Sequence, residues 1–177
     1  MLRELARKID AFQEVVGQGV SWLMFLLVAV VFSDVIFRYL LGVSFVFVQE
    51  LEWHLFGIIF LMAAGYTMLY NEHVRVDVVY ARLPPRRKAW FDFALIFVFL
   101  FPACVLLIYT TWPFVRNSFA VNEGSPDPGG IPARWALKSV IILGFALLFL
   151  QGISQAIKNF YVGMGWEDPE QRVQEIH

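Results

Sequence analysis

The sequence predicts an all-α integral membrane protein: four transmembrane helices with an N-terminal amphipathic lead-in and both termini cytoplasmic. Of its 177 residues, 59% are hydrophobic and only 16% are charged, with a mean hydropathy of +0.62. An ordinary soluble domain is about 45–50% apolar and about a quarter charged. Crossing a hydrocarbon core takes about 20 mostly apolar residues. Four stretches approach or exceed that length and are expected to form the helices, at about 21–41, 46–70, 86–115 and 136–162.

The segment before the first helix has a helical pattern of its own. Its apolar side chains recur every three or four residues, with charges on the other face: Leu2, Leu5, Ile9, Phe12 and Val16. This favours an amphipathic lead-in over 1–20 that lies on the inner leaflet; a simple extension of the first helix explains it equally well. The apolar run continues past Asp34 and Arg38 with no small-residue cleavage pattern, so we expect an uncleaved anchor. The chain is then a single membrane domain, 1–177, with a cytoplasmic tail at 163–177.

Polar residues mark the start of the second helix, and prolines mark the start of the third. Gln49, Glu50 and Glu52 are expected at the outer headgroup level, with Trp53 as an interfacial anchor. The third helix opens with Pro84 and Pro85, which suit a first turn because proline has no N–H to lose there.

A basic and aromatic group follows these prolines: Arg86, Arg87, Lys88 and Trp90. We expect it to contact anionic lipid headgroups, at about 1 kcal/mol per basic residue near the surface. Further along the same helix, Pro102 predicts a kink.

Small residues and turn formers mark the remaining packing features. Gly57 and Gly65 in the second helix, and Gly144 and Gly152 in the fourth, allow close helix packing, either internally or against a larger subunit. The outer connection 117–135 is rich in proline and glycine, which favour defined turns. It is either an ordered contact surface or a passive connector.

The distribution of Lys and Arg predicts the orientation. The N-terminal tail carries three, the 71–90 connection five and the last twenty residues two (Lys158 and Arg172), ten in all, against four on the opposite side. Basic residues concentrate on the cytoplasmic side of membrane proteins. Both termini and the 71–90 connection are therefore expected in the cytoplasm.

Charged residues within the helices are the first candidates for chemistry, because each is costly in the bilayer. Asp34 and Arg38 are four residues apart and can pair, and Glu50 or Glu52 lies at a similar depth. An ion or proton site is one interpretation; a structural ion pair that locks helices or meets a partner subunit is the favoured one.

No other combination of residues predicts a catalytic, metal or cofactor site, so no enzymatic activity is expected. His54 and His73 suggest haem ligands, but nineteen residues span about 28 Å of helix, too far to share one haem. The net charge of −1 does not indicate nucleic-acid binding. A small homo-oligomeric channel would need pore-lining polar stripes, and no helix shows one.

Four short motifs, in order, resemble the small membrane subunit (DctQ type, or Q subunit) of tripartite ATP-independent periplasmic (TRAP) transporters. They are Phe37-Arg38-Tyr39 closing the first helix, Glu50 opening the second, the block Glu72-His73-Val74-Arg75-Val76-Asp77, and Leu83-Pro84 before the basic start of the third. The four-helix topology agrees over nearly the whole chain.

The resemblance implies a small scaffold subunit of a secondary-active, sodium-coupled importer of organic acids in the bacterial inner membrane. Its implied partners are a large elevator-type membrane subunit (M subunit) and a periplasmic substrate-binding protein. Structural or interface roles are implied for Arg38, Glu50, His73, Arg75 and Asp77. Asp34, Glu52 and Trp53 join them on the residue argument above. The alternative is a membrane anchor subunit of a haem or quinone redox enzyme.

Overall fold

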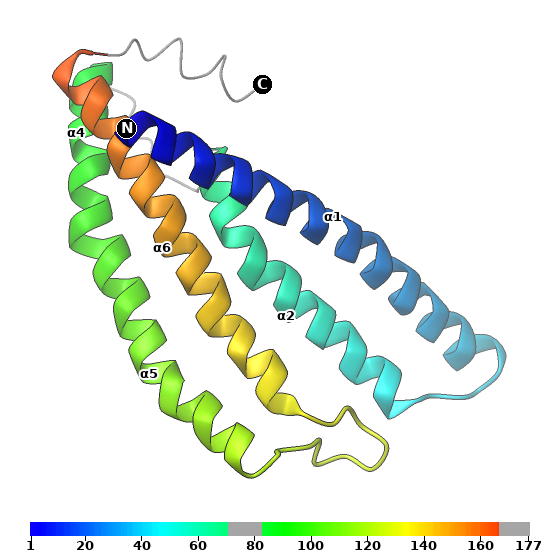
Figure 1. Cartoon of the computed structure of the whole chain (residues 1–177). Coiled ribbons are helices and arrows are strands. Elements are labelled where there is room, and N and C mark those ends of the chain that lie inside the picture. Colours follow the sequence, from blue (N-terminus) through cyan, green and yellow to red (C-terminus); the bar gives the residue numbers. More distant parts are fainter. Residues whose placement is uncertain (71–82, 167–177) are drawn as a thin grey trace.

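The computed structural model describes residues 1–70 and 83–166, and the regular structure in these two ranges is helical. The helices are α1 (Leu2–Leu40), α2 (Val46–Leu69), α4 (Pro85–Leu95), the π-helical turn η1 (Ile96–Leu100), α5 (Phe101–Ala120) and α6 (Arg134–Met164). Because α4, η1 and α5 form one rod, the described residues contain four helical spans long and apolar enough to cross a membrane. The all-helical, four-span prediction is thereby confirmed (Figure 1).

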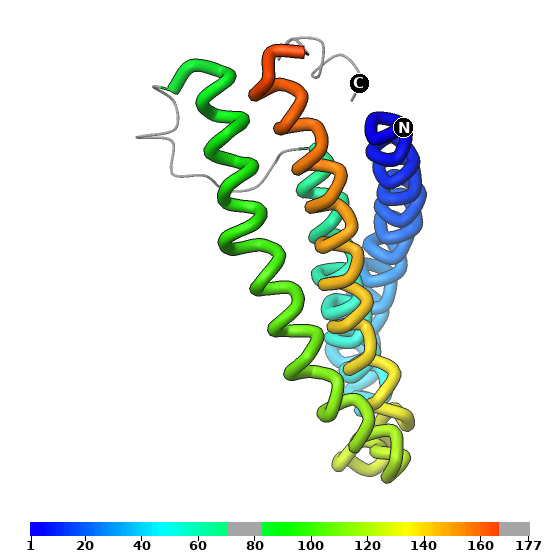
Figure 2. The backbone as a smooth tube through the Cα atoms, turned by 60° about the vertical axis from the view of Figure 1, so that its left-hand side comes forward, coloured from blue at the N-terminus to red at the C-terminus, as the bar shows by residue number. Residues whose placement is uncertain are grey.

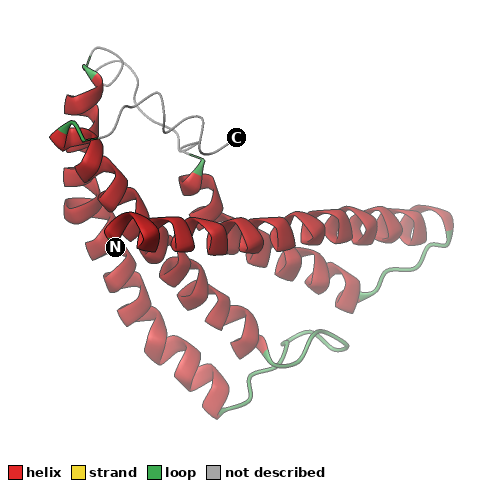
Figure 3. Cartoon of the chain, turned by 45° about the horizontal axis from the view of Figure 1, so that its top comes forward, coloured by secondary structure: helices red, strands yellow, loops and turns green. Residues whose placement is uncertain are grey.

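The bundle has two distinct ends, visible in Figure 1. The start of α1, the start of α4 and the end of α6 lie together at what we call the terminal end. The 41–45 and 121–133 connections lie at the opposite end, the loop end. The helices spread apart from the terminal end toward the loop end, as Figure 3 shows from a second direction.

Helix α1 is unbroken over its 39 residues, about 58 Å at the usual rise, well beyond a core of about 30 Å. Its buried positions form one stripe that starts within the expected lead-in: Ala6, Ile9, Gln13, Gly17, Val20 and Asp34. These side chains face α2 and α6. The structure therefore favours the extended-helix alternative for residues 1–20.

Helix α6 is the centre of the bundle. It packs against α1, α2, α4 and α5, whereas α4 and α5 make their main contacts with α6. Figure 2 accordingly shows α6 between α1 and the α4–α5 rod.

Glycines bring α6 close to its neighbours. A Cβ at Gly144 would lie 2.7 Å from the carbonyl oxygen of Leu61 in α2, and one at Gly152 would lie 2.6 Å from Leu100. Side chains that small allow the helix axes to approach. Of the two roles expected for these glycines, the structure shows internal packing.

The distortion expected at Pro102 takes the form of a widened turn rather than a sharp break. Proline lacks an N–H and its ring crowds the carbonyl four residues earlier, here Val98, which lies inside η1. A π-helical turn relieves this crowding. The rod consequently continues from α4 into α5.

Candidate interface at the loop end

Glu50 connects three segments at the loop end. It lies near the start of α2 and is only 4% exposed. Its carboxylate accepts hydrogen bonds from Ser125 Oγ and the Ile131 backbone N–H, both at 2.5 Å, and from the Arg134 guanidinium at 3.1 Å. A buried carboxylate is tolerated when it is paired and hydrogen-bonded in this way. Glu50 thereby fastens the 121–133 connection and the start of α6 to α2.

The connection folds tightly enough to reach this carboxylate. The Gly130 N–H donates to the Asp127 carbonyl at 3.0 Å, and Gly129 has φ +83°. With Pro128 before it, this is the pattern of a type II turn. A Cβ at Gly130 would lie 2.6 Å from Glu50 Oε2, so the close approach requires glycine. The turns expected from the proline and glycine content are present.

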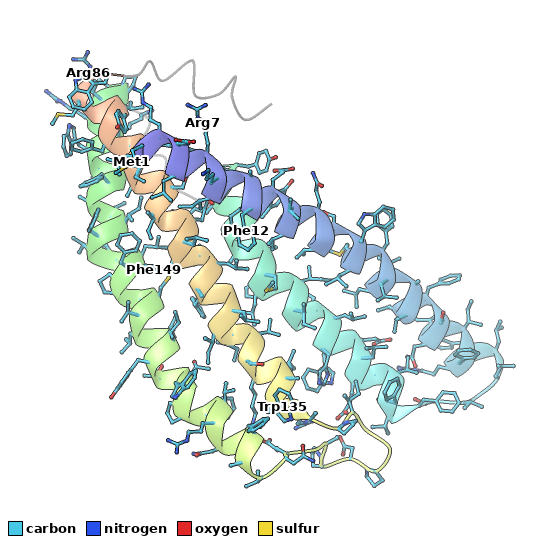
Figure 4. All side chains as sticks on the ribbon, viewed as in Figure 1. Met1, Arg7, Phe12, Arg86, Trp135 and Phe149 are labelled. Atoms are coloured by element: carbon cyan, nitrogen blue, oxygen red, sulfur yellow. The ribbon has the colours of Figure 1, made fainter. Side chains whose placement is uncertain are left out.

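A second set of contacts, which we call the clamp, holds the two ends of the 121–133 connection together. Lys138 in α6 forms a salt bridge with Glu123, and the Arg134 N–H donates to the Glu123 carbonyl at 2.8 Å. The hydrogen bond from Lys138 holds the pKa of Glu123 below its ordinary value. Trp135, labelled in Figure 4, packs edge-on against Phe119 at 5.0 Å between ring centroids.

Glu50 and Glu52, two residues apart in sequence, have separate surroundings. The guanidinium of Arg134, which binds Glu50, also lies 5.5 Å from the Trp53 ring centroid. Glu52 instead interacts electrostatically with Asp34 and Arg38 of α1. The Asp34–Arg38 salt bridge expected from their spacing is present. Of the two glutamates considered for this cluster, the structure brings Glu52 to it.

The predicted headgroup residues lie at the terminal end. Arg86 and Arg87 are exposed. The Arg86 side chain also covers the end of α6, because a Cβ at Gly165 would lie 2.6 Å from its guanidinium; Figure 4 shows Arg86 at the end of the bundle where Met1 lies. Lys88 is partly buried. Trp90 packs edge-on against Phe93 and Phe160. Three further candidates, His73, Arg75 and Asp77, lie outside the described residues.

A polar cluster between α1 and α6 was not predicted from the sequence. Asp10 accepts hydrogen bonds from Ser154 Oγ at 2.7 Å and from Gln151 Nε2 at 3.0 Å, and pairs with Lys158 at 2.5 Å. Nearby, Gln13 Nε2 donates to the Leu147 carbonyl at 2.7 Å.

The signal for this cluster was readable in the sequence. Polar residues recur at helical spacing near the end of α6, all on one side: Gln151, Ser154, Gln155, Lys158 and Asn159. These residues form a polar stripe along α6. The stripe faces α1 within the same chain, so it is a packing surface and not the lining of a pore.

The sequence profile described as the DctQ component of tripartite ATP-independent periplasmic transporters matches residues 27–161. The chain belongs to this family. It is also 31% identical, over 132 residues, to a Haemophilus influenzae protein whose name describes a TRAP transporter small permease protein. The alignment covers 72% of this chain and 78% of that protein.

Membership in the DctQ family makes this chain a multi-pass small permease subunit of a TRAP transporter. It implies association with a large membrane subunit and a substrate-binding protein. The haem or quinone anchor is not favoured. His54, one of its two candidate ligands, is buried, with Nδ1 2.6 Å from the Glu50 carbonyl oxygen.

Proposed function

We propose that this DctQ subunit is a static scaffold for a large, elevator-type membrane subunit that imports organic acids with sodium. A periplasmic binding protein delivers the substrate. The chain lies in the bacterial inner membrane, with the terminal end cytoplasmic and the loop end periplasmic. Arg86, Arg87, Lys88 and Trp90 contact anionic lipid headgroups, and His73, Arg75 and Asp77 support assembly at the cytoplasmic face.

The observation that carries the scaffold role is an apolar middle layer. Polar clusters occupy the two ends of the bundle, and each is bonded largely within the chain. Between them, every helix contributes an uninterrupted run of apolar residues: 22–32 in α1, 55–65 in α2, 96–108 in η1 and α5, and 140–150 in α6. An organic anion or a cation would need polar partners along its path. This apolar layer favours the role of a scaffold that does not itself conduct the substrate.

The anchored 121–133 connection supports the role of the loop end. The Glu123–Lys138 ion pair fixes it to α6, and the hydrogen bonds of Ser125 and Ile131 to Glu50 fix it to α2. A surface fixed before binding loses little conformational entropy when a partner docks. It therefore suits a soluble protein that docks and leaves repeatedly.

Reconstitution tests the proposal. The chain, the large subunit and the binding protein are purified, and uptake of a radiolabelled organic acid into proteoliposomes is measured with an inward sodium gradient. We expect uptake from the full set, none from this chain alone, and loss of uptake when potassium replaces sodium. Uptake by this chain alone, or a large subunit that does not co-purify with it, would overturn the scaffold role. Unchanged uptake in potassium would overturn the sodium coupling.

A further inference from the structure

One face of α2 is strongly aromatic and largely exposed, although the Arg134 guanidinium at the start of α6 lies beside Trp53. Trp53, Phe56 and Phe60 are 42%, 60% and 69% exposed. Their spacing puts them on one side of the helix, and the rings of Phe56 and Phe60 stack with centroids 6.3 Å apart. Leu61, which meets Gly144 of α6, lies on a different side of α2. We call the three exposed aromatic residues the α2 face.

A charge cluster borders the α2 face where α2 meets α1. It contains two carboxylates, Asp34 and Glu52, and one guanidinium, Arg38. Asp34 is buried and bonds to Arg38, whose side chain is half-exposed. Glu52 Oε1 is buried and accepts no hydrogen bond from any residue that the structure describes. With all three side chains ionised, the cluster has a net charge of −1.

Lipid chains complement the aromatic part of this surface but not its edge. An acyl chain has no donor for a carboxylate, and ionisable residues at membrane depth usually turn toward protein or water. The α4–α5 rod provides the contrast. It exposes Phe99 to 66%, and it has no charged residue between Asp92 and Arg116. That surface suits lipid.

We propose that the α2 face is the docking surface for the large membrane subunit, and that this subunit places a lysine or arginine beside Glu52. The aromatic residues supply apolar contact area, and the cation supplies both the missing charge and the missing donor. A desolvated ion pair of this kind also fixes the register of two helices. The inference rests on the proposed function, because it takes the large subunit as the occupant.

Photo-crosslinking in the co-expressed complex tests the location. A benzoylphenylalanine is placed singly at Phe56, Phe60 or Phe99; the last is a control of the same residue type and similar exposure. We expect covalent adducts with the large subunit at Phe56 and Phe60 and none at Phe99. Adducts at Phe99 and none in α2 would overturn the proposal.

Two substitutions at Glu52 test the cation. Glu52→Gln keeps the shape and removes the charge, so recovery of the large subunit with this chain should fall about tenfold, which corresponds to about 1.4 kcal/mol. Glu52→Lys should lower it further, while the fold of this chain, followed by its circular dichroism, is retained. Full recovery with Glu52→Gln would overturn the ion pair. If the unmodified chain fails to recover the large subunit, the proposed function itself fails, and the two failures are thereby distinguished.

Discussion

At the scale of single residues, Gly130 decides whether the loop end can close on Glu50. In Gly130→Ala the new Cβ would lie 2.4 Å from Ser125 Oγ and 2.6 Å from Glu50 Oε2. The hydrogen bond to Glu50 from Ser125 or from the Ile131 amide must then break. We expect the Ile131 amide to exchange with deuterium at least about tenfold faster, because its acceptor is displaced. Gly124→Ala is the matched control, since no atom lies within 4 Å of its new Cβ. Equal exchange in both variants would contradict the role of Glu50.

The clamp between Glu123 and Lys138 should make the loop end sensitive to acid. Folding lowers the pKa of Glu123 below its ordinary 4.5, chiefly because Lys138 hydrogen-bonds the carboxylate. A lowered pKa adds stability that is complete above 4.5 and is lost as the pH falls through the folded value. The melting temperature of Glu123→Gln should therefore lie below that of the unmodified chain at pH 7, and the difference should shrink below pH 4.5. A difference that stays constant to pH 3 would show that the charge contributes nothing.

The residue contacts differ in how far the sequence could predict them. Asp34 and Arg38 were paired from their spacing because both lie on one helix, four residues apart. The partner of Glu50, by contrast, is Arg134, 84 residues away. Helical periodicity does not relate positions on different helices, and the bond depends on how the 121–133 connection folds back. Only the structure could assign it.

At the scale of helices, the bonds of Asp10 join the start of α1 to the end of α6. Asp10→Asn leaves Lys158 without its anion in a site where each side chain is less than one-fifth exposed. Breaking one partner of such a pair costs about 3 kcal/mol. We expect Lys158→Met in the same chain to recover part of that loss in a double-mutant cycle of unfolding free energy. Glu4→Gln, on the exposed side of α1, is the control; strictly additive losses would argue against coupling.

Close packing between α2 and α6 gives a second prediction at this scale. A methyl group at Gly144 meets the backbone of Leu61, which cannot rotate away, whereas one at Gly57 has its nearest neighbour at 3.7 Å. Overpacking of this kind costs about 1–3 kcal/mol. Gly144→Ala should lower the unfolding free energy by that amount in detergent, and Gly57→Ala should not lower it. The reverse order would mean that the helices are not packed as described.

The helices themselves were predictable because hydropathy depends only on composition within a window. It was harder to predict where each helix begins and which other helices it packs against. The lead-in pattern at 1–20 fits a helix on a membrane surface as well as one that packs on α6, because both bury one apolar face. The polar side of α6 distinguishes the two arrangements, because residues 1–20 pack against it. That contact exists only in the folded bundle.

At the scale of the whole molecule, the uneven distribution of Lys and Arg makes a prediction about orientation. The fold places the start of α1 and the end of α6 at one end of the bundle (Figure 1). Ten of the 14 Lys and Arg residues lie in residues 1–20, 71–90 and 158–177. Because basic residues near membrane spans are retained in the cytoplasm, the terminal end should face inward and the loop end outward.

Cysteine labelling measures this orientation directly. The chain has a single native cysteine, Cys104, which is buried in α5, so Cys104→Ala provides a cysteine-free background. In intact spheroplasts a membrane-impermeant maleimide should label Gly124→Cys, which lies in the connection at the loop end. It should label Leu2→Cys, exposed at the start of α1, only after lysis. Labelling of Leu2→Cys in intact cells, with Gly124→Cys protected, would reverse the orientation and remove the loop end as a docking surface for a periplasmic protein.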